Sequence, residues 1–190
     1  MTNSLILVSG PARSGKSEWA EKLAINIAEN SEKSIIYVAT ATIATDDPEW
    51  QLRIKQHQER RPSDWQTIHV PYELSAVIQQ FSQTESCLLI DSLGTWLTNF
   101  LETDQLTWEK IVDELLNTLQ QVLQTGNCHL IFVSEETGWG LVPAYPIGRL
   151  FRDRLGSLTR KIGAIAQPVY LVTAGHVLNL SNLGTPLTND

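Results

Sequence analysis

Short, almost entirely apolar segments alternate along this chain with segments whose apolar residues recur at helical spacing. The first apolar run is LILVS, at Leu5 to Ser9. Beyond it, Trp19, Leu23 and Ile27 recur every four positions. An apolar run bounded by turn residues predicts a buried strand, and a recurrence of three to four residues predicts a helix with one buried face. The pattern therefore predicts strands and helices in alternation from the N-terminus onward.

The same criteria extend this alternation to the C-terminal part of the chain. Further strands are predicted at Ile35–Ala39, Thr67–Val70, Cys87–Asp91, Leu130–Ser134 and Val169–Thr173. Further helices are predicted at Asp46–Arg61, Leu74–Phe81, Leu93–Leu101, Trp108–Leu123 (with Gly126 as its C-cap) and Ile147–Ala166. Strands that are apolar throughout need cover on both faces. We therefore predict an α/β fold with a mainly parallel sheet and helices on both faces, in one domain over 1–180 followed by a polar, frayed tail over 181–190.

Length and charge exclude several classes of protein. The chain has 190 residues and a formal net charge of −7. An acidic surplus argues against a protein that binds nucleic acid by neutralising its phosphates. No apolar run approaches the roughly 18 residues of a membrane span, and the N-terminus MTNSLILVSG lacks the basic region of a signal peptide. We expect a cytoplasmic protein without a nucleic-acid partner, in which Cys87 and Cys128 are buried core residues.

The strongest chemical signal is the segment GPARSGKS, which matches the phosphate-loop pattern G-x-x-x-x-G-K-[ST] between a predicted strand and a predicted helix. Its glycines let successive N–H groups face a phosphate, and the helix N-terminus adds the positive end of its dipole. Lys16 would reach the β- and γ-phosphates, and the Ser17 hydroxyl would bind Mg²⁺. The predicted nucleotide-binding residues of this loop are Gly10, Pro11, Ala12, Arg13, Ser14, Gly15, Lys16 and Ser17.

A second metal-binding oxygen is expected at the end of a neighbouring strand. Asp91 ends the run CLLID, where a carboxylate would hold Mg²⁺ or its water shell near the phosphates. Because Asp91 and Ser92 also precede an apolar helix, capping of that helix is the alternative role for Asp91. We favour the metal role, and the two roles are compatible.

A polar segment over residues 46–65, DDPEWQLRIKQHQERRPSDW, surrounds His57 with basic side chains. The local chemistry leaves two interpretations open. One is a solvated basic helix with an incidental histidine. The other is a neutral imidazole nucleophile that attacks a phosphorus atom held by arginines. The phosphate loop by itself does not decide the class of protein, because nucleotide kinases, GTPases and RecA-like modules all contain one.

Several motifs together narrow this choice. They are LILVSGPARSGKSEWAE, YVATA, RIKQHQERRPSDWQT, LLIDSLGTWLTNFL, ETGWGLVP and GRLFRDRLGSLTRKIGAIAQPVYLVTAG. In these motifs the chain resembles, over nearly its whole length, the bifunctional adenosylcobinamide kinase / adenosylcobinamide-phosphate guanylyltransferase family of cobalamin biosynthesis. The resemblance implies a single-domain P-loop (RecA-like) fold and a homotrimer.

The resemblance also implies two reactions and the residues that serve them. Family members phosphorylate adenosylcobinamide with a nucleoside triphosphate, and then transfer GMP from GTP to that phosphate through a guanylyl-histidine. The nucleophile of the family corresponds to His57, and the Mg²⁺ ligands correspond to Ser17 and Asp91. Either Glu136 or Asp91 is a candidate base for the kinase step. Beyond the phosphate loop, the implied nucleotide contacts fall on Ala39, Thr40, Ala41, Gln58, Glu59, Arg60, Arg61, His69 and Asp91.

The chain departs from the family pattern at three places. Pro11 replaces a common glycine and removes one N–H donor from the loop. His69 stands where a glutamate is usual, and Glu135 stands where an asparagine is usual.

The predicted enzyme uses Mg²⁺, GTP and ATP on adenosylcobinamide. The alternatives are a small-molecule kinase without guanylyl transfer and a nucleotide-sensing module without a small-molecule substrate.

Overall fold

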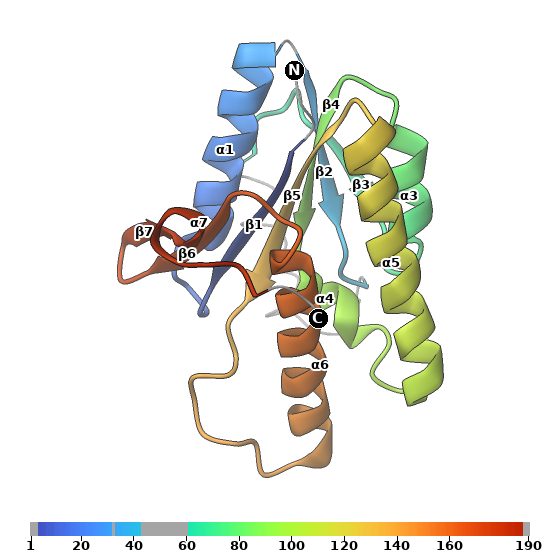
Figure 1. Ribbon diagram of the computed structural model, residues 1–190, viewed down its shortest axis with the longest axis vertical. Coiled ribbons are helices and arrows are strands. Elements are labelled where there is room, and N and C mark those ends of the chain that lie inside the picture. Colours follow the sequence, from blue (N-terminus) through green and yellow to red (C-terminus); the bar gives the residue numbers. More distant parts are fainter. Residues whose placement is uncertain (1–3, 32, 43–60, 188–190) are drawn as a thin grey trace.

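Strands of the described chain form one seven-stranded sheet in the order β3-β2-β4-β5-β1-β6-β7 (Figure 1). The computed structural model describes residues 4–31, 33–42 and 61–187. The strand bounds are β1 Leu5–Gly10, β2 Ser34–Ala39, β3 Gln66–His69, β4 Ser86–Asp91, β5 His129–Glu135, β6 Val169–Thr173 and β7 His176–Asn179. The pairings from β3 to β6 are all parallel, and β7 alone pairs antiparallel. The predicted mainly parallel α/β sheet is confirmed.

Helices cover both faces of this sheet, because its central strands are apolar on both sides (Figure 1). Leu5 and Leu7 of β1 pack in one core cluster with residues of α3, α4, α5 and α6. Ile6 and Val8 point to the opposite face and pack with residues of α1. The helix bounds are α1 Lys16–Ser31, α3 Leu74–Phe81, α4 Leu93–Thr98, α5 Gln105–Thr125, α6 Pro146–Gly163 and α7 Leu180–Leu183.

The predicted elements agree with the structure except at some ends. The helix Leu74–Phe81 and the strand Val169–Thr173 match at both ends. Helix α5 begins three residues earlier than predicted, because the Asp104 carboxylate caps it by accepting from the Thr107 N–H at 3.0 Å. Gly126 is its C-cap, as predicted. The helix predicted over 46–61 lies, apart from Arg61, outside the described residues.

The C-terminal end contains two elements that the hydrophobic pattern did not predict. Ala174 and Gly175 have φ values of 49° and 72°, and they join β6 to β7 in an antiparallel hairpin. Helix α7 follows, and its Ser181 hydroxyl accepts a 2.9 Å hydrogen bond from the Val169 N–H. The predicted tail therefore begins inside a short helix that is tied to β6. The pattern missed β7 because Val177 and Leu178 are adjacent apolar residues, both exposed, and show no alternation.

Two further sequence predictions concern the cysteines and the membrane. Cys87 and Cys128 are fully buried free thiols, which confirms their assignment to the core. Among the described residues, none of the helices combines the length and apolar character needed to cross a bilayer.

Candidate active site

The parallel strands bring most of the predicted site residues to one edge of the sheet. The phosphate loop follows β1, Ala39 ends β2, His69 ends β3 and Asp91 ends β4. Residues Ala39 and His69 are register partners, and so are Ala39 and Asp91. In an open parallel sheet, ligands bind outside the carboxyl ends of the strands. The predicted residues that the structure describes are therefore placed where such a fold binds its ligand.

The phosphate loop turns back on itself before α1 begins. Arg13 and Gly15 have φ values of 58° and 91°, in the left-handed region. The Ser14 N–H donates to the Pro11 carbonyl at 3.3 Å, and the Trp19 N–H donates to the Gly15 carbonyl at 2.9 Å as α1 starts. Such a turn aims backbone N–H groups and the helix N-terminus at one point, which is a binding site for an anion.

Gly10 is required by close packing at the start of the loop. A Cβ atom at this position would overlap the Val172 carbonyl oxygen of β6 and approach the Ser14 hydroxyl to 2.6 Å. The Gly10 carbonyl also accepts a 2.9 Å hydrogen bond from the Glu136 N–H. The loop is thus held between β6 and the segment that follows β5, with no room for a side chain.

Two polar side chains of the loop are buried and poorly satisfied by the protein. Lys16 is 7% exposed, and its Nζ donates to the Pro11 carbonyl at 3.3 Å. The Ser14 hydroxyl is buried and has no hydrogen-bond partner among the described residues. A buried ammonium group and a buried unpaired hydroxyl are costly unless a ligand completes their interactions. These groups fit an anionic ligand such as a phosphate.

Asp91 does not cap the helix that follows it. The Ser92 hydroxyl is the N-cap of α4 and accepts from the Thr95 N–H at 3.2 Å. The Asp91 carboxylate instead accepts a hydrogen bond from the Tyr37 hydroxyl, with 2.9 Å between the two oxygens. Of the two roles considered for Asp91, capping of α4 therefore belongs to its neighbour Ser92.

Thr40 is turned into the protein rather than toward solvent. Its side chain is fully buried, and its hydroxyl accepts from the Ser92 N–H at 2.9 Å and donates to the Ser92 carbonyl at 2.7 Å. Ala39 and Ala41, on either side of it, are half-buried. The Thr40 hydroxyl thus holds the residue next to Asp91, whereas any ligand contact at this turn would come from backbone or from the alanines.

Glu135 is a site residue whose role the sequence did not predict. Its carboxylate accepts from the Ser92 hydroxyl at 2.5 Å and from the Gly94 N–H at 2.9 Å. It therefore binds the N-terminus of α4, where a negative charge is favourable. The only signal in the sequence was that Glu135 ends a strand at a position where the family usually has an asparagine.

Among the nucleotide contacts implied at Gln58, Glu59, Arg60 and Arg61, Arg61 is the one that the structure describes. Its guanidinium carbon lies 3.4 Å from the centroid of the Tyr37 ring, and its Nη1 donates to the Thr67 hydroxyl at 3.3 Å. His57, Gln58, Glu59 and Arg60 lie outside the described residues. His69 is exposed at the end of β3, the edge strand of the sheet.

A cavity of about 330 Å³ lies beside the loop, on the face of the sheet that α6 covers. Its walls include Ser9 of β1, the adjacent Glu135 and Glu136, and Arg152 and Arg160 of α6. The combination of two carboxylates and two guanidinium groups suits a polar ligand that carries both donors and a negative charge.

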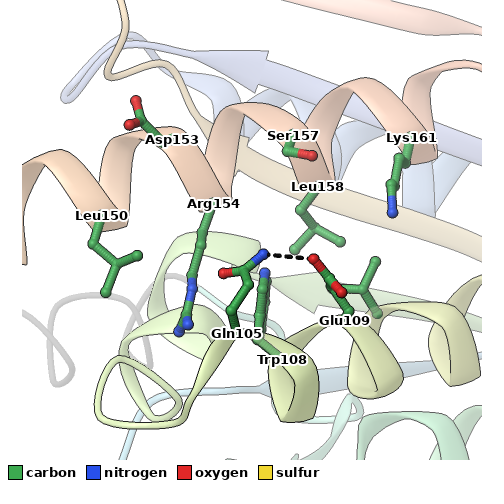
Figure 2. A pocket seen from close by; sticks show the side chains of 10 residues that line it. Gln105, Trp108, Glu109, Leu150, Asp153, Arg154, Ser157, Leu158 and Lys161 are labelled. Atoms are coloured by element: carbon green, nitrogen blue, oxygen red, sulfur yellow. Dashed lines mark hydrogen bonds between the residues drawn. The ribbon is translucent and has the colours of Figure 1, made fainter.

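Arg154, the second arginine of the sequence FRDR at residues 151–154, has a structural role. Arg154 extends from α6 toward α5, as Figure 2 shows, and it donates to the carbonyls of Phe100 and Thr103, each at 2.9 Å. Its guanidinium carbon also lies 5.3 Å from the centroid of the Trp108 ring. The groove around it has a volume of about 210 Å³ and includes no residue of the phosphate loop or of the strand ends.

The fold and the loop at its edge define an α/β protein of the P-loop class. The chain belongs to the cobinamide kinase / cobinamide phosphate guanyltransferase family, which it matches over residues 6–180. It is 36% identical over 181 residues to the bifunctional adenosylcobalamin biosynthesis protein CobP of Pseudomonas aeruginosa, covering 95% of this chain and 98% of that protein. It is 32% identical to the proteins CobU of Salmonella typhimurium and of Escherichia coli, each over 90% of this chain and 96% of the relative.

Proposed function

We propose that this chain is a bifunctional enzyme of cobalamin biosynthesis. It phosphorylates adenosylcobinamide with a nucleoside triphosphate, and then transfers GMP from GTP to adenosylcobinamide phosphate, giving adenosylcobinamide-GDP and pyrophosphate. The observation that carries the proposal is the near full-length match to relatives that are named bifunctional and to a family named for both activities. The buried Lys16 and the anion-binding turn of the phosphate loop support it.

The nucleotide is held by its phosphates in this proposal. The backbone of Gly10–Ser17 surrounds them, and Lys16 neutralises their charge. Mg²⁺ fits the donors that are present, since the Ser17 hydroxyl and the Asp91 carboxylate are oxygen ligands at one edge of the sheet. When bound, Mg²⁺ adds charge neutralisation at the phosphates. The two residues that would hold it are those predicted from the sequence.

The kinase step needs a positioned hydroxyl more than a strong base. The acceptor hydroxyl attacks the γ-phosphorus, a new P–O bond forms, the bond to the nucleoside diphosphate breaks, and the hydroxyl proton passes to a carboxylate. Glu136 lines the cavity beside the loop and donates its N–H to Gly10. Asp91 already accepts from Tyr37. These contacts favour Glu136 over Asp91 as the group that takes the proton.

Guanylyl transfer uses His57 as its nucleophile in this proposal. A neutral imidazole nitrogen attacks the α-phosphorus of GTP, so an N–P bond forms as the bond to pyrophosphate breaks. An oxygen of adenosylcobinamide phosphate then displaces the imidazole. Four peptide units allow at most about 14 Å between the Cα atoms of His57 and Arg61. Arg61 is fixed on Tyr37, next to Asp91, which supports a reaction at the same edge of the sheet.

The test is to incubate the protein with adenosylcobinamide, Mg²⁺, ATP and GTP and to separate the corrinoid products. We expect adenosylcobinamide phosphate first, and then adenosylcobinamide-GDP with one pyrophosphate per GMP transferred. Product that stops at the phosphate, with GTP in excess, would establish the kinase-only alternative. Nucleotide binding without any corrinoid product would establish the sensing module.

We also propose that the protein assembles as a homotrimer, as the family resemblance implies. The loop between β5 and α6 extends away from the body of the molecule (Figure 1). Its apolar side chains are exposed, as are neighbours at the start of α6: Trp139, Leu141, Val142, Tyr145 and Ile147. An apolar patch of this kind is typical of a protein interface. Sedimentation equilibrium should give three times the 21.3 kDa chain mass, and the mass of a monomer would contradict the proposal.

A further inference from the structure

We propose that the cavity between α6 and the end of β1 holds the arm of the acceptor that carries the reacting hydroxyl, and that Arg152 and Arg160 bind the phosphate once it is formed. The ligand chemistry is a phosphate monoester on a chain that also carries N–H or O–H donors. The inference rests on the proposed function, which names adenosylcobinamide as the acceptor but does not say where it binds. It gives a role to two arginines that the proposed mechanism does not use.

The cavity adjoins the phosphate loop through residues that are directly connected to it. Ser9 lines the cavity and precedes Gly10, and Glu136 lines it while its N–H donates to the Gly10 carbonyl at 2.9 Å. Helix α6 begins beyond the carboxyl ends of β1 and β5 and supplies another wall (Figure 1). The volume of about 330 Å³ is that of a small-ligand site. It suits a short polar arm, so the macrocycle of the acceptor would stay outside.

One face of α6 presents an arginine, a glycine and an arginine to this cavity. Arg152, Gly156 and Arg160 follow one another at intervals of four residues, so they lie on the same side of the helix. A Cβ atom at Gly156 would meet no atom of the described chain within 4 Å, so packing does not require glycine here. Glycine inside a helix is less stable than alanine. The bare backbone leaves room for a ligand between the two guanidinium groups.

The polar side chains of the cavity keep much of their hydrogen-bonding capacity for a ligand. The Arg160 guanidinium and the Glu136 carboxylate make no hydrogen bond or ion pair with any residue that the structure describes. Arg152 contacts its neighbour Asp153 through Nε, at 3.5 Å, which leaves its Nη groups for other acceptors. Ser9 is 4% exposed, and the hydrogen bond from its hydroxyl to a carbonyl of β6 is long, at 3.4 Å. A polar ligand would complete these interactions.

The two signs of charge suit the acceptor before and after its phosphorylation. A neutral hydroxyl or amide N–H can donate to the Glu136 carboxylate, which is available because the neighbouring Glu135 is already bound to α4. A phosphate ester is repelled by a carboxylate but forms charge-assisted hydrogen bonds with guanidinium groups. Phosphorylation therefore moves the favourable contacts from Glu136 to Arg152 and Arg160, which would retain the intermediate for guanylyl transfer.

A phosphate in this cavity could come from the acceptor or from the nucleotide. None of the described residues that line the cavity is aromatic, so a nucleotide base would find no ring to stack on. The triphosphate already has the backbone of Gly10–Ser17 and the buried Lys16. These observations favour the acceptor, and the experiment separates the two sources.

Three variants test the site, and each has a control on another side of α6. Arg152→Gln and Arg160→Gln each remove one charge, and Lys161→Gln removes an equal charge elsewhere on the helix. Gly156→Leu fills the cavity with a good helix former, and Ser157→Leu adds the same side chain at the next position. Lys161 and Ser157 line the groove between α6 and α5 that Figure 2 shows, which does not include the three tested residues.

The first measurement is the KM of each corrinoid in its own reaction, adenosylcobinamide with ATP and adenosylcobinamide phosphate with GTP. The KM of the phosphate should rise about 10-fold in Arg152→Gln, the effect of losing one charge-assisted hydrogen bond. It should rise about 5-fold in Arg160→Gln, because Arg160 is more exposed and solvent screens its charge. The KM values of adenosylcobinamide, ATP and GTP should stay within about 2-fold. A merely structural role would change both corrinoids alike, and Lys161→Gln should change none of these values.

The second measurement uses the variant that fills the cavity. In Gly156→Leu the KM values of both corrinoids should rise by about 10-fold or more, because the leucine side chain occupies the space of the arm. The KM values of ATP and GTP should stay within about 2-fold, and the melting temperature should not fall, since leucine favours the helix. Ser157→Leu should behave like the unmodified protein. If melting shows that Gly156→Leu fails to fold, the two arginine variants still test the site.

Each part of the inference has its own contrary result. An unchanged KM of adenosylcobinamide phosphate in both arginine variants overturns the phosphate contact, and a rise confined to ATP or GTP assigns the phosphate to the nucleotide instead. A folded Gly156→Leu protein with unchanged corrinoid KM values overturns the cavity as the acceptor site. If the unmodified protein forms no corrinoid product, the proposed function itself fails. An active unmodified protein with unaffected variants refutes this inference alone.

Discussion

Replacing Lys16 by alanine is expected to slow adenosylcobinamide phosphorylation by about 10²- to 10³-fold, which is the usual effect of removing one preorganised charge-stabilising group. Lys16 begins α1, is 7% exposed, and lies over the phosphate loop through its bond to the Pro11 carbonyl. A buried ammonium group in this place neutralises charge that develops as the γ-phosphoryl group leaves. The measurement is the initial rate of adenosylcobinamide phosphate formation at saturating Mg²⁺ and ATP.

Lys22→Ala is the matched control for this variant. Lys22 lies on the same helix but is exposed, so its removal should leave the rate within about 2-fold, as for most surface changes. The loss of Lys16 also removes an unfavourable buried charge when no ligand is present. We therefore expect the variant to fold and to melt no earlier than the unmodified protein. A folded Lys16→Ala protein with an unchanged rate would refute the role of the loop in phosphoryl transfer.

Replacing His57 by alanine is expected to abolish covalent labelling of the protein by GTP that carries label at the α-phosphate. No other group replaces a nucleophile whose nitrogen forms the bond to phosphorus. The kinase step does not use this bond, so adenosylcobinamide phosphate should still form and accumulate. The measurement is acid-labile, base-stable label on the denatured protein, with γ-labelled GTP in parallel, which should leave none.

His176→Ala controls for the loss of a histidine. His176 is exposed at the start of β7, where its Nδ1 lies 2.9 Å from the Ala174 carbonyl oxygen, and its variant should label like the unmodified protein. Label retained by His57→Ala would place the nucleophile elsewhere. The absence of label from both proteins, with GTP binding intact and pyrophosphate removed, would refute a covalent intermediate and favour the kinase-only alternative.

The phosphate loop could be predicted because its physics is local. The loop lies within eight consecutive residues, and the strand before it and the helix after it follow from periodicity in the same stretch. Asp91 was found for the same reason, as the last residue of an apolar run. The strands were predicted because a central parallel strand must be apolar on both faces. The edge strand β7, which is mostly exposed, carries no such signal and was missed.

The partners of these residues could not be predicted, because each contact joins residues far apart in the chain. Tyr37 and Asp91 are separated by 54 positions, Thr40 and Ser92 by 52, and Ser92 and Glu135 by 43. Only strand order and register determine which side chains meet over such distances. The family resemblance implied a nucleotide contact at Thr40, which stays a prediction, and the sequence left capping of α4 as the alternative to the favoured metal role of Asp91. The structure shows Thr40 holding the residue after Asp91, and Ser92 as the cap.

The sequence by itself thus determined the fold class, the phosphate loop and the carboxylate at the end of β4, because local periodicity and spacing encode them. The tertiary structure alone decided what surrounds that carboxylate. The parallel register brings β2 beside β4, so one buried tyrosine touches both Asp91 and Arg61. Burial then makes these contacts specific, since a polar group removed from water must find its partner within the protein.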